Sequence, residues 1–278
     1  MVLIAGSDGL IGAALKESII SQGISCWATS RRSGSKVPRL DLVDDPNSWQ
    51  LPGKVDTAFL CMAQCSLKAC EEAPVQTAFI NVERTVELAR RLLARDAFVV
   101  FLSTNLVFDG SRPFFTPDDP PNPTTEYGRQ KLSAENALQS LYSNVAIVRL
   151  TKVVHPNMAL IQAWRETLQR GEIIQPFCDF LFSPIQLSFV VDALEKIAAR
   201  KLVGITHLSG DCDVSYEELA RMLAKSLSVD EALVRSTSAP PEKRGFSTLN
   251  MDRAVRELGI QVPSVLQSLE FLFNKNVN

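Results

Sequence analysis

VLIAGSDGLIG, residues 2–12, joins a short apolar run to three glycines that stand at every third position. Apolar residues then recur every four positions until Gly23, a residue that readily adopts the left-handed conformation that ends helices. We therefore predict a strand, a glycine-rich turn and a helix. Glycines in such a turn let the backbone approach a pyrophosphate, and the helix N-terminus favours its negative charge. The stretch predicts a dinucleotide-binding site, with a plain strand-to-helix turn as the alternative.

The alternation of strand and helix continues beyond this stretch. Apolar runs predict further strands at residues 24–29, 55–63, 97–102, 144–150 and 204–209. A helix is expected over residues 75–95, and its buried stripe is predicted to consist of Val82, Val86, Ala89 and Leu93. The pattern predicts an α/β fold with a Rossmann-type, doubly wound parallel sheet.

The chain is long for a single domain, at 278 residues. We predict that residues 1–150, together with about 186–210, form a dinucleotide-binding Rossmann domain. Residues 151–185 and 211–278 lose the strict alternation. They are predicted to form a smaller C-terminal α/β lobe that lies over the carboxyl edge of the sheet and binds the substrate.

Composition excludes several classes of function. Hydrophobic residues make up 46% of the chain and charged residues 22%, as in an ordinary globular protein. The 29 basic and 31 acidic residues are mixed along the chain, so we expect neither nucleic acid nor an anionic membrane as a partner. The N-terminus lacks the positive leader of a signal peptide, and no apolar run is long enough to span a bilayer. A cytoplasmic location is predicted.

Six cysteines are too few and too irregularly spaced for a disulfide framework in a chain of this length. Cys61, Cys65 and Cys70 lie close together in the sequence. They lack the paired spacing of zinc ligands, however, and both histidines are far away. We predict reduced thiols that pack as small hydrophobic residues, and no metal site.

The second predicted strand ends in Ser30, Arg31 and Arg32. A site that prefers NAD usually carries an acidic residue here for the ribose hydroxyls, whereas an arginine accommodates the 2′-phosphate of NADP. Because no acid is present, NADP is predicted over NAD, with two solvated arginines in a polar loop as the alternative. Asp41 and Leu42 follow a short apolar approach and are expected near the adenine.

Tyr127 and Lys131 stand one helical turn apart in EYGRQKLSAENALQSLY, residues 126–142. Leu138 and Leu141 continue the same face, so the pair is predicted to lie against the protein body. A phenol with an ordinary pKa of about 10 exchanges protons near neutral pH only if a nearby positive charge stabilises its phenolate. We predict that Lys131 supplies this charge and lowers the pKa of Tyr127.

Thr104 and Asn105 follow the predicted strand at residues 97–102. They should therefore stand at the carboxyl edge of the sheet, where ligands of open α/β sheets bind, and a hydroxyl there can hydrogen-bond a substrate oxygen. A proline-rich loop leads from this point to the helix that carries the phenol, whose first turn Thr124 or Thr125 can cap.

Three motifs occur in a fixed order along the chain. They are G-x-x-G-x-x-G at residues 6–12, L-S-T-N-x-x-F-D-G at residues 102–110 and Y-x-x-x-K at residues 127–131. Together they resemble the extended short-chain dehydrogenase/reductase family. Within that family the chain is similar to RmlD-like dTDP-4-dehydrorhamnose reductases, whose matching segments are S-T-D-Y-V-F-x-G and Y-G-x-x-K. The resemblance spans nearly the whole chain.

The resemblance implies hydride transfer between NADPH and a keto or hydroxyl carbon of a nucleotide-activated sugar. In the family pattern, Tyr127 protonates the carbonyl oxygen, Lys131 lowers the pKa of Tyr127 and holds the nicotinamide ribose, and Thr104 hydrogen-bonds the reacting oxygen. The residues expected to bind the cofactor, besides Tyr127 and Lys131, are Gly6, Ser7, Gly9, Leu10, Ile11, Arg31, Arg32, Asp41, Leu42 and Ala63. The candidates for substrate contacts are Asn105, Lys152 and Arg244, with Arg149 and His155 considered beside them.

Two segments depart from the family pattern. Asn105-Leu106 stands where the reductases carry Asp-Tyr, and Cys61–Cys65 replaces an alanine-rich segment. The hydride machinery is intact, but the sugar stays open, and the missing acid/base pair argues against a dehydratase. Epimerases hold NAD tightly, which the arginine pair does not favour. A non-catalytic NADP-binding regulatory subunit of a partner enzyme is the other function left open, and a homodimer is compatible with the sequence.

Overall fold

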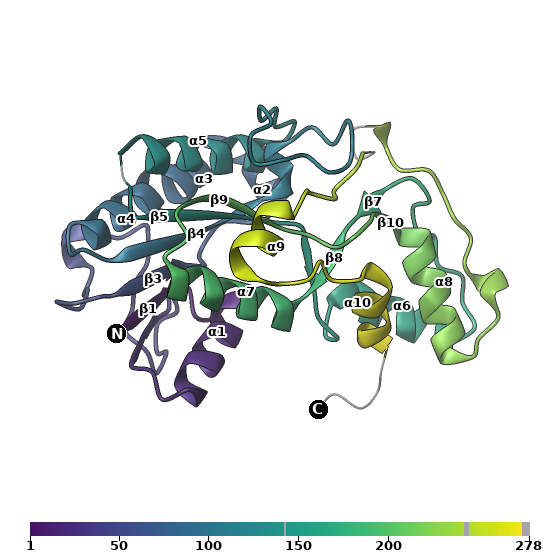
Figure 1. Ribbon diagram of the computed structural model, residues 1–278. Helices are drawn as coiled ribbons and strands as arrows, with labels where there is room; N and C mark the ends of the chain where they lie inside the picture. Colours follow the sequence, from purple (N-terminus) through teal and green to yellow (C-terminus); the bar gives the residue numbers. More distant parts are fainter. Residues whose placement is uncertain (142, 242–244, 274–278) are drawn as a thin grey trace.

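The computed structural model describes residues 1–141, 143–241 and 245–273 and has a six-stranded parallel sheet at its centre (Figure 1). Neighbouring strands are parallel, in the order β2-β1-β3-β4-β5-β9. The strands are β1 (Val2–Ala5), β2 (Cys26–Thr29), β3 (Thr57–Leu60), β4 (Phe98–Thr104), β5 (Val145–Leu150) and β9 (Gly204–Leu208). Strand β2 is added on one side of β1, and β3 and the later strands are added on its other side. The strand order therefore reverses between β1 and β3, which is the topological switch point of the sheet. The predicted Rossmann-type α/β fold is confirmed.

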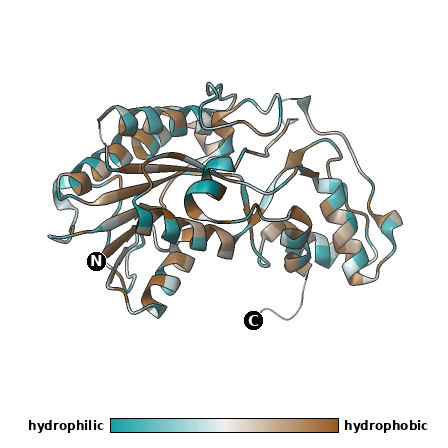
Figure 2. Cartoon of the chain, in the orientation of Figure 1, coloured by the Kyte–Doolittle hydropathy of each residue, from teal (hydrophilic) through white to brown (hydrophobic). Residues whose placement is uncertain are grey.

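The sheet is buried on both faces. Every residue of β3 and β4 is buried, as parallel strands covered by helices on both sides should be. Figure 2 shows the strands as a brown, hydrophobic layer between helices of mixed hydropathy. The third strand ends at Leu60, so Cys61 and the residues after it leave the sheet as a connecting segment.

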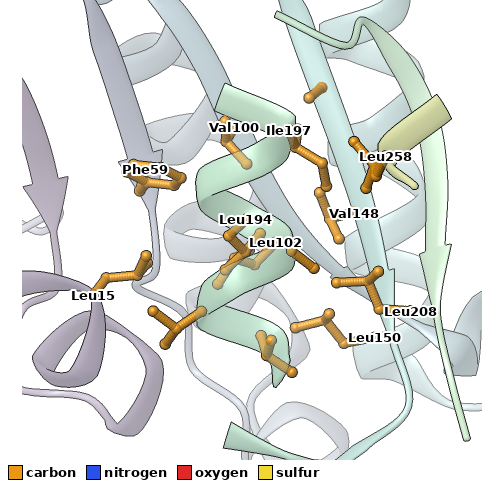
Figure 3. Close-up of a cluster of buried hydrophobic side chains, with 14 of the residues drawn as sticks. Leu15, Phe59, Val100, Leu102, Val148, Leu150, Leu194, Ile197, Leu208 and Leu258 are labelled. Carbon is orange, nitrogen blue, oxygen red and sulfur yellow. The ribbon is translucent and has the colours of Figure 1, made fainter. Parts of the chain in front are cut away.

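Three helices cover one face of the sheet. They are α1 (Leu10–Ser21), α7 (Leu187–Arg200) and α9 (Asp252–Leu258). Figure 3 shows Leu194 and Ile197 of α7 among side chains of the sheet such as Leu102 and Val148. Leu258 of α9 and Leu15 of α1 complete the same buried cluster.

The opposite face is covered by two longer helices. They are α4 (Thr85–Leu93) and α5 (Glu126–Leu141), and shorter elements precede them: η1 (Pro46–Ser48), α2 (Leu67–Glu72), α3 (Pro74–Ala78), the π-helical η2 (Phe79–Arg84) and η3 (Asn105–Val107). Leu88 and Leu92 of α4 and Leu138 of α5 pack with Phe101 of β4 in a second buried cluster.

The predicted helix over residues 75–95 is not one regular helix. It is divided into α3, η2 and α4, and the wider π-helical turn of η2 shifts the helical phase of everything after it. The buried residues of α4 are therefore Thr85, Leu88, Ala89 and Leu92. The predicted stripe was right at Ala89 and partly right at Val86 and Leu93, which are half-buried and pack against the second buried cluster, whereas half-buried Val82 is not part of it.

α5 begins as the sequence predicted. The hydroxyl of Thr125 accepts a hydrogen bond from the backbone N–H of Gly128 at 3.1 Å, which caps the first turn. Lys131 and Leu138 are buried along the inner face of the helix, whereas the side chain of Leu141 lies outside the described residues. The inner face of α5 thus rests on the sheet.

A third buried cluster lies beside the sheet and forms the right-hand part of Figure 1. Its elements are α6 (Ala159–Gln169), β7 (Leu181–Phe182), β10 (Val214–Ser215), α8 (Tyr216–Leu227), η4 (Glu231–Leu233) and α10 (Val265–Phe273). The parallel pair β6 (Lys152–Val154) and β8 (Pro184–Gln186) connects it to the main sheet. Within the range 211–278, however, Met251, Ala254 and Leu258 pack on the main sheet with α7, not in this third cluster.

Candidate active site

The carboxyl edge of the sheet gathers four parts of the chain. The turn Gly6–Gly9 follows β1, the segment Cys61–Cys65 follows β3, and Thr104 ends β4. The first turns of α5 reach the same edge, because they pack on η3 directly after β4. Parallel strands present their C-terminal ends together, which is why residues from distant parts of the sequence meet here.

Two glycines of the first motif are required by close contacts. Gly6 has φ +86°, and a Cβ there would stand 2.9 Å from the backbone nitrogen of Met62. At Gly12, a Cβ would stand 2.3 Å from the carbonyl oxygen of Gly6. The first glycine lets the turn pass close to the Cys61–Cys65 segment, and the second lets α1 start against the turn. Gly9 is exposed, and a Cβ there would make only an ordinary contact of 3.5 Å.

The N-terminus of α1 is open to a ligand. Its N-cap, Gly9, provides no side-chain cap for the first N–H groups. The hydroxyl of Ser7 is already used inside the fold, since it donates to the carbonyl oxygen of Thr29 at 3.0 Å. Leu10 is exposed and Ile11 is half-buried beside this opening. A helix N-terminus of this kind accommodates an anion.

Asp8 connects the glycine turn to the end of β2. Its carboxylate accepts a short hydrogen bond from the hydroxyl of Ser30 and lies 3.8 Å from Nε of Arg32. Arg31 and Arg32 are both exposed, so the ion pair contributes little to stability. Two cations therefore stand beside the turn at the position predicted for a 2′-phosphate.

The other expected cofactor contacts have structural partners. Asp41 pairs with Arg39 at 3.1 Å, and its carbonyl oxygen accepts a hydrogen bond from the indole of Trp49 at 2.9 Å. Leu42 is 5% exposed and packs in the core. Its side chain faces away from a surface ligand, so only its backbone is available for contact. Ala63 is half-buried in the segment after β3.

Lys131 is buried on the inner face of α5. Its side chain is 2% exposed, and Nζ lies 3.9 Å from the centroid of the Phe101 ring, a cation–π contact. Burial lowers the pKa of Lys131 to about 8, against the opposing influence of Cys65, Glu135 and Cys61. Within the described part of the chain no hydrogen bond or ion pair engages this ammonium group.

Tyr127 points its hydroxyl at a thiol. The Tyr127 hydroxyl donates to Sγ of Cys65 at 3.8 Å. Burial, followed by the influence of Cys65, raises the pKa of Tyr127 well above its ordinary value. The prediction that Lys131 lowers the pKa of Tyr127 is therefore wrong for this structure, because burial disfavours the phenolate and the neighbouring thiol of Cys65 acts in the same direction.

Thr104 and Asn105 stand at the predicted edge, but both have internal partners. Oγ1 of Thr104 accepts a hydrogen bond from the backbone N–H of Leu106 at 3.2 Å. The amide of Asn105 donates to the hydroxyl of Ser247 at 3.0 Å, which links β4 to a distant part of the chain. The structure thus brings Asn105 next to Ser247, a residue far along the chain.

Four residues remain from the candidates for substrate contacts. Lys152 is exposed at the start of β6, and His155 is half-buried, with its pKa lowered by burial and by Lys152. Arg244 lies outside the described residues. Arg149 is fully buried and bound to Glu135, so its earlier consideration as a substrate contact is wrong.

The ion pair between Arg149 and Glu135 was not foreseen. Nη2 of Arg149 lies 2.7 Å from the Glu135 carboxylate, both side chains are 1% exposed, and Ser103 donates a short hydrogen bond to the same carboxylate. Glu135 follows Lys131 by four residues, so its place on the same helix face was readable from the sequence. The network ties α5 to β4 and β5.

Asn81 is a second residue that the sequence analysis missed. Its side chain accepts from the backbone N–H of Gln64 at 2.8 Å and donates to Gln64 O at 3.1 Å and to Gln130 at 2.8 Å. The residue lies in the π-helical turn η2 and fixes the segment after β3 against α5. No local pattern signals this role, because all its partners are distant in sequence.

Three further findings concern the described residues. Among the described residues no group of three or more His, Cys, Asp or Glu side chains is arranged to hold a metal ion. In the same part of the chain, no helix has the length and apolar character needed to cross a bilayer. All six cysteines have free thiols.

The chain is similar to known proteins over nearly its whole length. Residues 1–277 match the model of the family described as RmlD substrate binding domain. A probable low-salt glycan biosynthesis reductase, Agl14, from Haloferax volcanii is 24% identical, over 98% of this chain and 97% of that protein. The methionine adenosyltransferase 2 subunit beta of Rattus norvegicus is also 24% identical, over 86% of this chain and 76% of that protein.

Two solved structures share the fold. MoeE5 in complex with UDP-glucuronic acid and NAD has a TM-score of 0.82 and 23% identity, and 98% of this chain and 97% of that chain are covered. A dTDP-4-dehydrorhamnose reductase from Bacillus anthracis in complex with NADP has a TM-score of 0.83 and 21% identity, with 98% and 96% covered.

Proposed function

The chain belongs to the RmlD substrate binding domain family, and from this premise we propose that it is an NADPH-dependent reductase of a nucleotide-activated keto-sugar. The observation that carries the proposal is the position of Tyr127 and Lys131 at the edge of the sheet that also carries the glycine turn. The name of the Haloferax volcanii relative, a reductase of glycan biosynthesis, supports the same reaction class.

The residues at this edge fit a dinucleotide. The Gly6–Gly12 turn has no room for side chains at two of its three glycines, and the N-terminus of α1 has no side-chain cap. A diphosphate would meet free N–H groups there, and the buried ammonium of Lys131 would meet the hydroxyls of a ribose. NADPH, when bound, supplies the hydride.

The preference for NADP over NAD rests on Arg31 and Arg32. The solved neighbours hold NAD in one case and NADP in the other, so they favour neither. Both arginines are exposed directly after β2, where a 2′-phosphate would carry its charge, and no acidic residue competes for ribose hydroxyls in the stretch 30–32. Arg31 and Arg32 fit an epimerase that retains NAD less well than they fit a reductase that uses NADPH.

The proton is assigned to Tyr127. Its hydroxyl is proposed to leave Sγ of Cys65 and donate to the substrate carbonyl oxygen, and a pKa raised by burial keeps this proton in place until the carbonyl oxygen becomes basic. Thr104 is proposed to donate to the same oxygen in place of Oδ1 of Asn105, to which its hydroxyl donates at 3.5 Å, while its Oγ1 keeps the hydrogen bond from Leu106. In this proposal, Lys131 binds the cofactor and does not stabilise a phenolate at Tyr127.

The sugar nucleotide is assigned to the space between the sheet edge and the second lobe. We propose residues 1–150 and about 186–210 as the cofactor-binding unit, and residues 151–185 and 211–278 as the substrate-binding unit, with α9 attached to the former. Asn105, through its bond to Ser247, lies where the two units meet. Lys152 and Arg244 remain proposed contacts for a diphosphate.

The proposal is tested by measuring NADPH oxidation with a panel of nucleotide keto-sugars, through the change in NADPH absorbance. Wild type is expected to turn over at least one of them, and Tyr127→Phe is expected to lose about a hundredfold or more in kcat, because general acid catalysis contributes this much. Tyr216→Phe removes a half-buried phenol in the second lobe and is the matched control, expected to keep its turnover. Equal rates for the two variants would contradict the assignment of Tyr127.

A regulatory role is the second candidate. The methionine adenosyltransferase 2 subunit beta of Rattus norvegicus is a relative of similar identity, and its name describes a subunit of another enzyme. The internal bonds of Tyr127 to Cys65 and of Asn105 to Ser247 are compatible with a centre that does not turn over. NADPH binding without turnover of any keto-sugar in the panel would favour this role over the reductase.

A further inference from the structure

Asp8 is the only charged residue in the sequence of the glycine turn, residues 6–12. Its carboxylate accepts a short hydrogen bond from the hydroxyl of Ser30 and lies 3.8 Å from Nε of Arg32. The side chain of Asp8 is 29% exposed, so the carboxylate is held against the end of β2 and still meets solvent. A negative charge therefore lies next to the two arginines to which the 2′-phosphate of NADPH is assigned.

Ser30 holds this carboxylate in place. The residue is 1% exposed, and its Oγ also accepts a hydrogen bond from the backbone N–H of Arg32 at 2.9 Å. The backbone N–H of Ser30 donates to the carbonyl oxygen of Pro38 at 3.1 Å, and its carbonyl oxygen accepts from the N–H of Leu40 at 2.9 Å. Because these bonds fix Ser30, the Asp8 carboxylate that it binds is fixed as well.

Arg31 and Arg32 differ in their surroundings. Arg32 has Asp8 as an ion-pair partner, and because the Arg32 side chain is 76% exposed, this pair does not immobilise the guanidinium group. Among the residues that the structure describes, the Arg31 side chain has no ion-pair partner. Arg31 therefore offers its full charge to a phosphate, whereas part of the charge of Arg32 is compensated by Asp8.

The Asp8 carboxylate acts in opposite directions on the two nucleotides. It repels a 2′-phosphate and weakens the attraction of that phosphate to Arg32. NADH carries a 2′-hydroxyl in place of the phosphate, and a carboxylate accepts a hydrogen bond from such a hydroxyl. The acidic residue that usually performs this role follows the second strand, whereas here the carboxylate comes from the glycine turn.

We propose that Asp8 is a specificity-determining residue, which reduces the preference for NADPH over NADH that Arg31 and Arg32 provide. Specificity is a difference between two affinities, so a single carboxylate changes it by weakening one nucleotide and supporting the other. The inference rests on the proposed function, because it takes the dinucleotide to lie in the glycine turn. It goes further by assigning the discrimination to a residue outside the stretch 30–32.

Calorimetric titration of NADPH and NADH into the full chain tests the proposal, with wild type compared to Asp8→Asn. The asparagine keeps a side-chain oxygen that accepts a hydrogen bond from Ser30, so the variant chiefly removes the charge. The ratio of NADPH affinity to NADH affinity is expected to rise at least about threefold, because the repulsion of the 2′-phosphate is lost. Glu217→Gln is the matched control, since this carboxylate of α8 is 22% exposed and pairs with Arg221 at 2.7 Å, and the ratio should stay unchanged.

A second variant and a second pair of ligands make the test independent of one substitution and of the nicotinamide. Asp8→Ala removes the hydrogen bond to Ser30 together with the charge, and it should raise the ratio as well. It replaces Asp8→Asn if that protein does not fold, as judged by circular dichroism. Adenosine 2′,5′-bisphosphate and AMP differ by the same 2′-phosphate, and their affinities are expected to shift in the same direction as those of NADPH and NADH.

The inference is overturned if the affinity ratio in Asp8→Asn falls or rises by less than about threefold, because the carboxylate would then only support Arg32. Wild type that binds NADPH or NADH, with a ratio that the variant leaves unchanged, overturns this inference and leaves the proposed function standing. Absence of binding of either nucleotide by wild type overturns both. The two failures are therefore distinguishable.

Discussion

Arg31 and Arg32 are exposed at the end of β2, next to a glycine turn whose helix carries no side-chain cap. At the scale of single residues, we propose that the choice of cofactor depends on these two cations. A guanidinium that hydrogen-bonds a phosphate contributes more than an ordinary neutral hydrogen bond, because one or both partners are charged. The proposed function therefore predicts that the two arginines contribute to the binding of NADPH and not to the binding of NADH.

The double variant Arg31→Ala/Arg32→Ala is expected to weaken NADPH binding by roughly tenfold to a hundredfold, the equivalent of about 1.5–3 kcal/mol. Its affinity for NADH should change little. Fluorescence titration of both nucleotides measures this difference, and Arg256→Ala, an exposed arginine on α9, is the control. A parallel loss of NADPH and NADH affinity would argue against a 2′-phosphate contact.

The titration of Lys131 is expected to change the free energy of unfolding and the affinity for NADPH in opposite directions as the pH rises. Its folded-state pKa of about 8 is lower than the ordinary value of 10.5, so the unfolded chain binds more protons between these two pH values. The free energy of unfolding of wild type, relative to Lys131→Met, should rise by up to about 3 kcal/mol from pH 8 to pH 10.5. NADPH affinity should fall over the same window, because the ammonium loses its charge.

Urea unfolding and NADPH titration at several pH values measure the two trends. Comparison with Lys131→Met cancels the groups that titrate in both proteins. A relative stability that falls with rising pH would mean that the lysine has a charged partner in the fold, contrary to the contacts described above.

The surroundings of Lys131 show which features of the site the sequence could predict and which it could not. The spacing of Tyr127 and Lys131 correctly placed them on one helix with the lysine buried, because helical periodicity is local information. The direction of the pKa shift of Tyr127 was wrong, and the Cys65 contact was missed. Both depend on the segment after β3, which lies some sixty residues earlier in the chain.

At the scale of elements, the position of α5 on η3 depends on a residue with no side chain. A Cβ at Gly128 would stand 2.1 Å from the carbonyl oxygen of Leu106 and 3.1 Å from Cβ of Pro123. Both the helix and the 3-10 turn are held by the strands behind them, so neither can retreat without cost. The glycine that follows Tyr127 is therefore what lets the helix approach the end of β4.

Gly128→Ala is expected to destabilise the protein by about 3 kcal/mol, as overpacking against backbone does. The midpoint of thermal unfolding should fall by roughly 5–10 °C for a chain of this size. Gly53→Ala is the matched control, since a Cβ there meets no atom within 4 Å. Equal midpoints for the two variants would show that α5 is free to shift.

Element boundaries show the limit of periodicity as a guide. The strands were placed correctly within a few residues, because a strand buried on both faces is apolar throughout. The buried face of the helix over residues 75–95 was predicted only in part, because a π-helical turn interrupts the helix without any local sequence signal. Asn81 lies in that turn, and its partners Gln64 and Gln130 become neighbours only in the folded protein.

At the scale of the whole molecule, we propose that two units meet at the carboxyl edge of the sheet. The bond from Asn105 to Ser247 and the bridge between Phe115 and Leu249 connect β4 and its loop to the chain that leaves the second lobe. That returning chain continues into α9, which packs on the sheet. A division by sequence alone could not foresee this return, since α9 lies far beyond the last strand in the chain.

The central claim is that a dinucleotide lies in the glycine turn, and calorimetric titration of NADPH into wild type and Gly9→Asp tests it most directly. Gly9 is exposed and has room for a side chain, so the variant should fold, while its carboxylate would repel a diphosphate at the N-terminus of α1. Measurable NADPH binding by wild type and a loss of at least about tenfold in the variant are the predicted results, equivalent to about 1.4 kcal/mol. Absence of binding by wild type, or equal binding by both proteins, would contradict the account.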